Sequence, residues 1–127
     1  MLVSVEIATS AACWLTAGAW GAGVPAGAVE AGYEIVLHVV MIPLELSGPR
    51  VAVRVAAGGH SVPQGKLAAR YRRLWPNVAA AVPLCRRAVF WDNSSRDGPV
   101  EVAAFRLGVA DFPPRWPDWT PEELRLL

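Results

Sequence analysis

The sequence predicts an α/β domain in which a parallel sheet is flanked by helices. Three stretches carry this prediction: a β-branched apolar run at 33–42, an apolar stripe with helical spacing between 67 and 82, and a second apolar run at 86–91. Strands buried inside parallel sheets are apolar almost throughout, and the helices between them repeat their apolar residues every three or four positions. The 127 residues leave room for one such domain.

The N-terminal segment 1–29 is unusual because residues 7–29 carry no charged side chain and are rich in Ala and Gly. A secretory signal would start with basic residues, whereas the only early charge is Glu6. A membrane span would be richer in Leu, Ile and Val. We therefore expect a poorly structured or displaced N-terminus, with neither export nor a membrane anchor.

The first expected elements follow from residue 33 onward. The run 33–42 reads as a strand covered on both faces, which Pro43 ends. Ser47 is expected to cap a short helix with Pro49 in its first turn, and Gly58-Gly59 to stop that helix.

A longer helix is expected to start at Ser61 and Pro63. Pro76 should kink this helix, because proline lacks an amide donor and crowds the preceding turn. Its apolar stripe consists of Leu67, Tyr71, Leu74, Val78 and Val82.

Residues 86–91 read as a second buried strand that a turn closes at 92–95, and 100–107 could form one more strand. Thr120-Pro121-Glu122-Glu123 has the pattern of a capping box, so a short C-terminal helix should begin there. The tail 113–119 is expected to pack its tryptophans over the domain.

Positive charge is concentrated in the middle of the chain, although the net charge is only +1. Residues 46–91 contain eight Lys or Arg and no Asp or Glu, whereas 1–45 contain four acids and no base. This sorting indicates a site for an anion, and phosphate suits it best. The eight basic residues are Arg50, Arg54, Lys66, Arg70, Arg72, Arg73, Arg86 and Arg87.

Two helices that meet at a Gly-Gly-His turn could form a phosphate clamp. Lys66, Arg70 and Arg73 share one helix face, and Arg50 and Arg54 lie one turn apart on the preceding segment. Arginine donates two parallel hydrogen bonds to phosphate oxygens. The alternative is a solvated face whose arginine stems cover a thin alanine core.

Three further residues have both a functional and a structural interpretation, and a fourth, His38, has a structural one only. His60 could donate to phosphate or act as an acid or base, or it could simply occupy a turn. His38 reads as a hydrogen-bonded core residue. Asp92 and Asn93 follow a strand, where α/β proteins bind ligands, but both are also common turn formers.

The cysteines are isolated and favour a reducing, cytoplasmic environment. Cys13 and Cys85 have neither CxxC nor zinc-ligand spacing, so no metal site is predicted. The weak net charge argues against nucleic acid and membrane surfaces as partners.

At these residues the sequence resembles zeta-toxin-like P-loop kinases, in their C-terminal half only. The resemblance covers about residues 31–127 and rests on 54–63, Arg70-Tyr71-Arg72-Arg73, Asn77, 92–94 and 115–121. It implies a partial P-loop kinase-like fold and a lid at about 47–75. Such kinases phosphorylate UDP-N-acetylglucosamine or a similar hydroxyl substrate with ATP and Mg²⁺, and an antitoxin neutralises them.

By the same resemblance, Arg54 matches a lid arginine that stabilises the phosphoryl group in transfer. Arg50, His60, Arg70, Arg73, Asp92 and Asn93 would then be candidates for binding phosphate or nucleotide.

The chain departs from the family in lacking G-x-x-x-x-G-K-[ST] and the upstream general base. Around Lys66, its only lysine, Gly59 is too far upstream, and Leu67 stands where Ser or Thr is required. The family's P-loop strand–helix unit is therefore missing.

Two hypotheses follow. The chain is the C-terminal portion of a truncated kinase, inactive alone, and a complementary N-terminal chain could complete it. Alternatively, it is a noncatalytic anion- or nucleotide-binding module, or an interaction module, that retains the arginine-rich lid.

Overall fold

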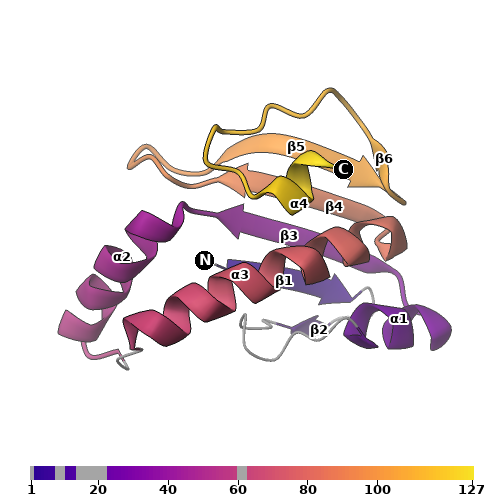
Figure 1. The fold of residues 1–127 in the computed structure, drawn as a ribbon. Helices are drawn as coiled ribbons and strands as arrows, with labels where there is room; N and C mark the ends of the chain where they lie inside the picture. Colours follow the sequence, from indigo (N-terminus) through magenta and orange to yellow (C-terminus); the bar gives the residue numbers. More distant parts are fainter. Residues whose placement is uncertain (1, 8–10, 14–22, 60–62) are drawn as a thin grey trace.

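The computed structural model describes residues 2–7, 11–13, 23–59 and 63–127, and it has an α/β architecture with an open mixed sheet (Figure 1). The strands are β1 (Leu2–Ile7), β2 (Ala11–Cys13), β3 (Ile35–Met41), β4 (Arg87–Asp92), β5 (Val100–Arg106) and β6 (Val109–Ala110). The helices are α1 (Gly23–Glu30), α2 (Leu44–Ala56), α3 (Gln64–Ala81), the 3-10 turn η1 (Val82–Leu84) and α4 (Glu122–Arg125).

The sheet contains six strands in the order β2-β1-β3-β4-β5-β6, and β3–β4 is the parallel pair among them. The predicted α/β class is confirmed, but the prediction of a parallel sheet is wrong. The long excursion through α2 and α3 returns the chain in its original direction, so β3 and β4 run parallel. Short connections reverse the chain before β5 and again before β6, which gives antiparallel neighbours.

The N-terminal segment contains strands, although the sequence led us to expect little structure there. β1 pairs antiparallel with β3 along its whole length, with Leu2 opposite Val40 and Ile7 opposite Ile35. The chain therefore supplies a neighbour for β3 on the side away from β4.

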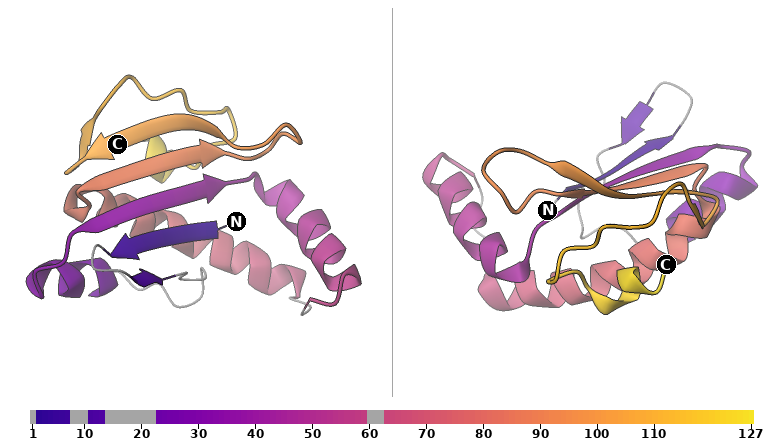
Figure 2. Two further views of the ribbon diagram at one scale, coloured as in Figure 1. Left: turned by 180° about the vertical axis from the view of Figure 1, so that it is seen from behind. Right: turned by 90° about the horizontal axis from the view of Figure 1, so that it is seen from above.

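Strand β3 is covered fully on one face only. Ile35, Leu37, Val39 and Met41 are buried, whereas the residues between them are half-buried. The expectation of a strand covered on both faces is therefore wrong. Figure 2 shows the reason, because α3 and α4 both lie on the same side of the sheet.

Helix α3 packs its predicted stripe against this face. Leu74, Val78 and Val82 are buried, Tyr71 packs at the edge of the core, and Trp75 joins them with 2% of its surface exposed. Helical structure continues past Pro76 to Ala81. No helix in the described ranges is both long and apolar enough to cross a bilayer.

Helix α2 begins earlier than the sequence predicts. Pro43, not Ser47, is its N-cap residue, and Ser47 is buried within the helix. Pro43 has an extended backbone and directly follows the strand, so the chain enters the helix without a capping side chain. Pro49 consequently lies inside the helix and not in its first turn.

The C-terminal tail packs over the sheet as expected. The Trp116 ring meets Phe90 edge-on at 5.3 Å between ring centroids and lies nearly parallel to Phe105 at 6.4 Å. The backbone amide of Arg115 donates to the carbonyl of Val102 at 2.7 Å, which fixes the tail along β5. The aromatic residues therefore extend the core beyond the helices.

Helix α4 forms where expected, but the predicted capping box does not. Pro121 is the N-cap residue and no side chain caps the helix. Thr120 is buried, and its hydroxyl lacks a hydrogen-bond partner among the described residues. Its carbonyl instead accepts a hydrogen bond from Nε of Arg125 at 3.1 Å.

Candidate functional site: the carboxyl edge of β3 and β4

The parallel pair β3–β4 brings two strand ends to one edge of the sheet. Met41 lies beside Asp92 in the register, and the amide of Asn93 donates to the carbonyl of Met41 at 2.9 Å. The carboxylate of Asp92 accepts a hydrogen bond from the amide of Ser94 at 2.8 Å, which closes a tight turn. Asp92 and Asn93 therefore act as turn formers at the place where α/β sheets bind ligands.

Arg50 connects helix α2 to this edge. Its Nη2 atom donates to the carbonyl oxygen of Asn93 at 2.6 Å, and the side chain is half-buried. A guanidinium group carries five N–H donors, so this bond leaves others for a ligand. The contact joins the two sequence-predicted residues Arg50 and Asn93, which are far apart in the chain.

Arg54 lies one helical turn beyond Arg50 and is exposed in the last turn of α2. The two residues share a helix face, so Arg54 extends the positive charge outward from the sheet edge. A cation is also favoured at this position by the helix dipole.

The Gly-Gly turn fixes the end of α2 around the backbone of Arg54. The amide of Gly59 donates to the Arg54 carbonyl at 2.8 Å, and the amide of Gly58 donates to the Val55 carbonyl at 3.0 Å. Gly58 has a φ of +96°, which completes a Schellman motif. A Cβ atom on Gly59 would lie 2.8 Å from the Arg54 carbonyl oxygen. The predicted glycine stop is thus confirmed, and both glycines have a structural reason.

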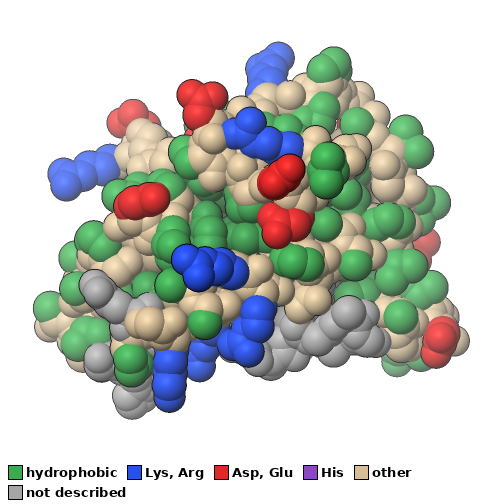
Figure 3. Space-filling model, viewed as in Figure 1, with side chains coloured by type: hydrophobic (Ala, Val, Ile, Leu, Met, Phe, Trp, Pro, Cys, Tyr) green, Lys and Arg blue, Asp and Glu red, His purple; other side chains and the backbone are tan. Residues whose placement is uncertain are grey.

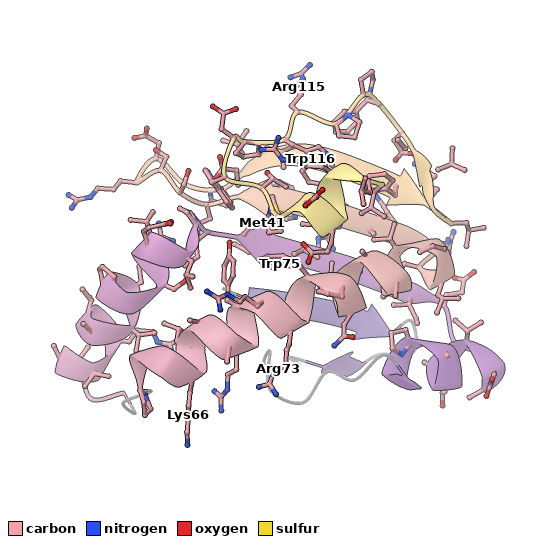
Figure 4. The ribbon with its side chains drawn as sticks, viewed as in Figure 1. Met41, Lys66, Arg73, Trp75, Arg115 and Trp116 are labelled. Atoms are coloured by element: carbon pink, nitrogen blue, oxygen red, sulfur yellow. The ribbon has the colours of Figure 1, made fainter. Side chains whose placement is uncertain are left out.

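The basic residues of α3 form a second group. In Figure 4, Lys66 and Arg73 point to the same side of α3 and away from the ends of β3 and β4. Arg70 lies between them in the helical repeat and is also exposed. In Figure 3, blue side chains gather below α3 with no red ones among them. The structure thus brings Arg50, Asp92 and Asn93 to one edge. Arg54 lies one helical turn further along α2, and the basic residues of α3 lie on another side.

Tyr71 connects α3 to the same sheet edge by a hydrogen bond. Its hydroxyl donates to the carbonyl of Ile42 at 3.2 Å, and its ring meets Trp75 edge-on at 5.2 Å. Burial, with a contribution from the negative charge of Glu45, raises the pKa of Tyr71 to about 12. The phenol therefore stays neutral at pH 7 and serves as a hydrogen-bond donor.

Most of the arginines near the site lack acidic partners. Within the described ranges the ion pairs are Arg86–Glu34, at 2.5 Å, and Arg106–Asp111, at 3.0 Å. Arg86 is therefore neutralised locally, although it belongs to the basic block of the sequence. Arg50 and Arg54 have no ion pair with any described residue, so their charge is available to an anion.

Two further expectations concern His60 and the lack of a metal site. His60 lies outside the described residues. The described part of the chain contains no group of His, Cys, Asp and Glu side chains able to hold a metal ion.

Trp91 and His38 form a pair that the sequence interpretation missed. Nε1 of Trp91 donates to Nδ1 of His38 at 3.4 Å, and the rings are inclined by 23° with centroids 6.4 Å apart. Both side chains are half-buried, so His38 is hydrogen-bonded as expected but is not a core residue. The alternation of His38 with buried Leu37 and Val39 was the signal for its position on the opposite face.

Comparisons of the chain with protein-family models, with curated proteins and with solved structures found no match.

Proposed function

We propose that this chain binds the phosphate groups of a nucleotide or nucleotide-sugar as the C-terminal, lid-bearing portion of a zeta-toxin-like kinase, and that it is inactive alone. The observation that carries the proposal is the position of Arg50 and Arg54. Arg50 is bonded to the turn after β4, and Arg54 is exposed one turn away without an acidic partner among the described residues.

The arrangement supports phosphate binding for a physical reason. Charge-assisted hydrogen bonds from arginine to phosphate are stronger than hydrogen bonds between neutral groups. They are favoured further when the orientation of the guanidinium group is already restricted before the ligand binds. Arg50 is such a group, because its contact with Asn93 restricts its orientation. Arg54 would supply the mobile second contact and, in a complete kinase site, stabilise the transferred phosphoryl group.

The sequence also accounts for the expected lack of turnover. A P-loop holds ATP and Mg²⁺ through its backbone amides, its lysine and its Ser or Thr hydroxyl, and no such motif is present. The chain would contribute charge to phosphate but no base and no magnesium ligand set. Incubation with ATP, Mg²⁺ and UDP-N-acetylglucosamine should therefore yield no phosphorylated product, and turnover would refute this assignment.

The direct test measures tripolyphosphate binding by isothermal titration calorimetry at several salt concentrations. Arg54→Gln should weaken binding roughly tenfold or more, since one charge-assisted contact is lost. Arg115→Gln is the matched control, because Arg115 is exposed and points away from this edge in Figure 4. Equal effects of the two variants, or an absence of binding in the wild-type chain, would contradict the proposal.

A second candidate is a free-standing noncatalytic anion-binding module, favoured by one observation. β1 of the same chain already pairs with β3 on the side where a missing N-terminal half would be sought. An N-terminal kinase half with a P-loop, added in trans, should restore phosphate transfer if the chain is a broken kinase. No restoration, together with retained tripolyphosphate binding, would favour the module.

A further inference from the structure

The end of the sheet opposite α2 exposes a row of apolar side chains. Figure 1 shows α1 and β6 together at this end of the sheet, with α2 at the other. In Figure 3, hydrophobic side chains follow this right-hand border, and no blue ones lie among them in this view. Contiguous exposed apolar surface is typical of sites of protein association. We call this surface the apolar edge, and its exposed residues are Val29, Tyr33, Leu84, Leu107 and Val109.

Contacts between the elements make these residues one surface. The amide of Leu107 donates to the carbonyl of Cys85 at 3.0 Å, so the turn after β5 lies against the end of η1. A Cβ atom on Gly108 would lie 3.4 Å from Pro83, so this turn packs closely on η1. The other neighbour of η1 is α1, which carries Val29. The apolar edge therefore runs without a break from α1 through η1 to β6.

Leu107 has a backbone conformation that is unfavourable for leucine. Arg106 pairs with Val109, so Leu107 and Gly108 are the two central residues of a hairpin turn. Their φ angles are +49° and +82°, which is typical of a type I′ turn, where Asn-Gly, Asp-Gly and Gly-Gly are preferred. A bulky residue is rare in this left-handed region, because its Cβ atom crowds the backbone.

Packing within the chain does not explain Leu107 either, because this residue is 66% exposed. Neither the turn nor the core requires a leucine at this position. A contact with a surface outside the chain does require one, since a buried leucine gains much more from leaving water than an asparagine or a glycine. A strained residue with no role inside the fold indicates a function at the surface.

The described charged side chains at the apolar edge balance each other. Arg86 pairs with Glu34 at 2.5 Å beside Tyr33, and Arg106 pairs with Asp111 at 3.0 Å beside the turn. Each end of the row thus carries one acid and one base. A two-fold rotation reverses the row, so the acid at each end can meet a base of a second copy. Two further charged residues at this end, one of each sign, are Glu30 and Arg87.

This balance favours a second copy of the chain over a strongly charged partner. An acidic protein or a nucleic acid gains no electrostatic attraction from a surface without net charge. Two copies would repel each other at α2 or at α3, because basic residues predominate on both helices. The apolar edge is therefore a surface where copies can approach each other without electrostatic repulsion.

We propose that the chain forms a symmetric dimer through the apolar edge, with Leu107 of each copy packed against the apolar edge of the other. The surface is small, so the dimer is weak and depends on concentration. Because β6 has only two residues, side chains and not a continuous sheet join the two copies. The proposed phosphate site lies at the other end of the sheet, so the dimer does not depend on it and leaves it free.

Sedimentation velocity of the full chain between about 5 and 500 μM measures this association, because small interfaces bind weakly. The wild-type chain should change from monomer to dimer as its concentration rises. Leu107→Asn should weaken the dimer about 10- to 100-fold, since a buried leucine side chain is lost from the contact. Val53→Gln is the matched control, because Val53 is 71% exposed on α2 and its loss should leave the dimer unchanged.

Two further measurements separate the contact from the folding of the turn. Asparagine suits a type I′ turn, so dilute Leu107→Asn should unfold at the same temperature as wild type or at a higher one. Val109→Thr keeps the β-branched shape of an exposed strand residue and should weaken the dimer about 2- to 30-fold, because a hydroxyl group enters the contact. Raising NaCl to about 1 M should leave the dimer intact, because salt screens charges and not apolar contacts.

Each outcome decides for or against the dimer. A wild-type chain that stays monomeric at the highest concentration would overturn the proposal, as would equal weakening by Leu107→Asn and Val53→Gln. Dissociation of the dimer at high salt would assign the contact to oppositely charged surfaces and also overturn it. A lower unfolding temperature of dilute Leu107→Asn would mean that leucine stabilises the turn itself, which contradicts its proposed role.

Discussion

At the scale of single residues, burial sets the chemistry of two ionisable side chains near the core. Tyr71 donates to the Ile42 carbonyl at the edge of the sheet, and its pKa is raised to about 12. Cys85 has no exposed surface, donates to the Ala81 carbonyl at 3.2 Å, and has its pKa raised to about 11 by desolvation. Both groups therefore prefer their neutral form in the folded chain.

Tyr71 should make folding stability fall at high pH. In the unfolded chain tyrosine titrates near pH 10, so between pH 10 and 12 the unfolded state loses a proton that the folded state keeps. The contribution is complete below pH 10 and is lost as the pH rises through 12. Urea unfolding at pH 9 and pH 11 should show a larger loss for wild-type chain than for Tyr71→Phe.

The same comparison has an internal control. Cys85 also lowers the free energy of unfolding between about pH 9 and 11, but it does so equally in wild type and Tyr71→Phe. The difference in unfolding free energy between the two chains therefore reports the Tyr71 phenol alone. At neutral pH, Tyr71→Phe should cost about 1 kcal/mol, because the hydrogen bond to Ile42 is lost. Identical pH slopes for the two chains would show that Tyr71 is not the responsible group.

Cys85 should resist alkylation in the folded protein. Its thiolate is the reactive form, and both burial and the raised pKa suppress it. In a Cys13→Ser background, iodoacetamide at pH 8 should modify the remaining thiol only after denaturant is added. Rapid labelling of the native chain would mean that this part of the core opens readily.

At the scale of elements, the ends of helices were harder to predict than their existence. The stop of α2 at Gly58-Gly59 could be predicted, because a left-handed residue after a helix is usually glycine, and Gly58 has this conformation. The close approach of the Arg54 carbonyl gives Gly59 its own reason. The starts could not be predicted. Ser47 and Thr120 are good capping residues by type, yet Pro43 and Pro121 begin the helices and both polar side chains are buried. Tertiary packing decided these positions over local preference.

Two glycine substitutions should have opposite effects on stability. Gly59→Ala places a Cβ atom 2.8 Å from the Arg54 carbonyl oxygen, so the turn after α2 must shift, at a cost of about 1–2 kcal/mol. Gly65→Ala meets no atom within 4 Å inside α3 and should stabilise the chain by up to about 1 kcal/mol. Thermal unfolding followed by circular dichroism measures both, and a stable Gly59→Ala chain would contradict the fixed turn.

At the scale of the whole molecule, the candidate site was predictable only in part. Arg50 and Asn93 were each selected from the sequence, and the structure joins them across the parallel pair. The division between the arginines of α2 and those of α3 was not foreseen, because spacing along one helix does not give its orientation to another. The pair of Trp91 with His38 was missed because it joins two strands, and the pairing of β3 with β4 fixes which of their residues are neighbours.

The C-terminal tail, residues 113–119, should contribute measurably to the free energy of unfolding. Trp116 contacts both Phe90 and Phe105, so Trp116→Ala removes an aromatic cluster and should cost roughly 2–3 kcal/mol for a half-buried ring. Trp116→Phe should lose less, because it retains part of these contacts. Urea denaturation with both variants measures the difference, and equal losses would show that the contacts a phenylalanine ring can keep contribute nothing to stability.

The outermost strands of the sheet have a consequence for self-association. β2 is three residues long and β6 is two, so each outermost strand offers few backbone groups to another chain. Long, flat borders are where proteins polymerise into fibrils, and short ones discourage this. Strand pairing between copies through these outermost strands would therefore be short, and the native chain should not seed cross-β growth.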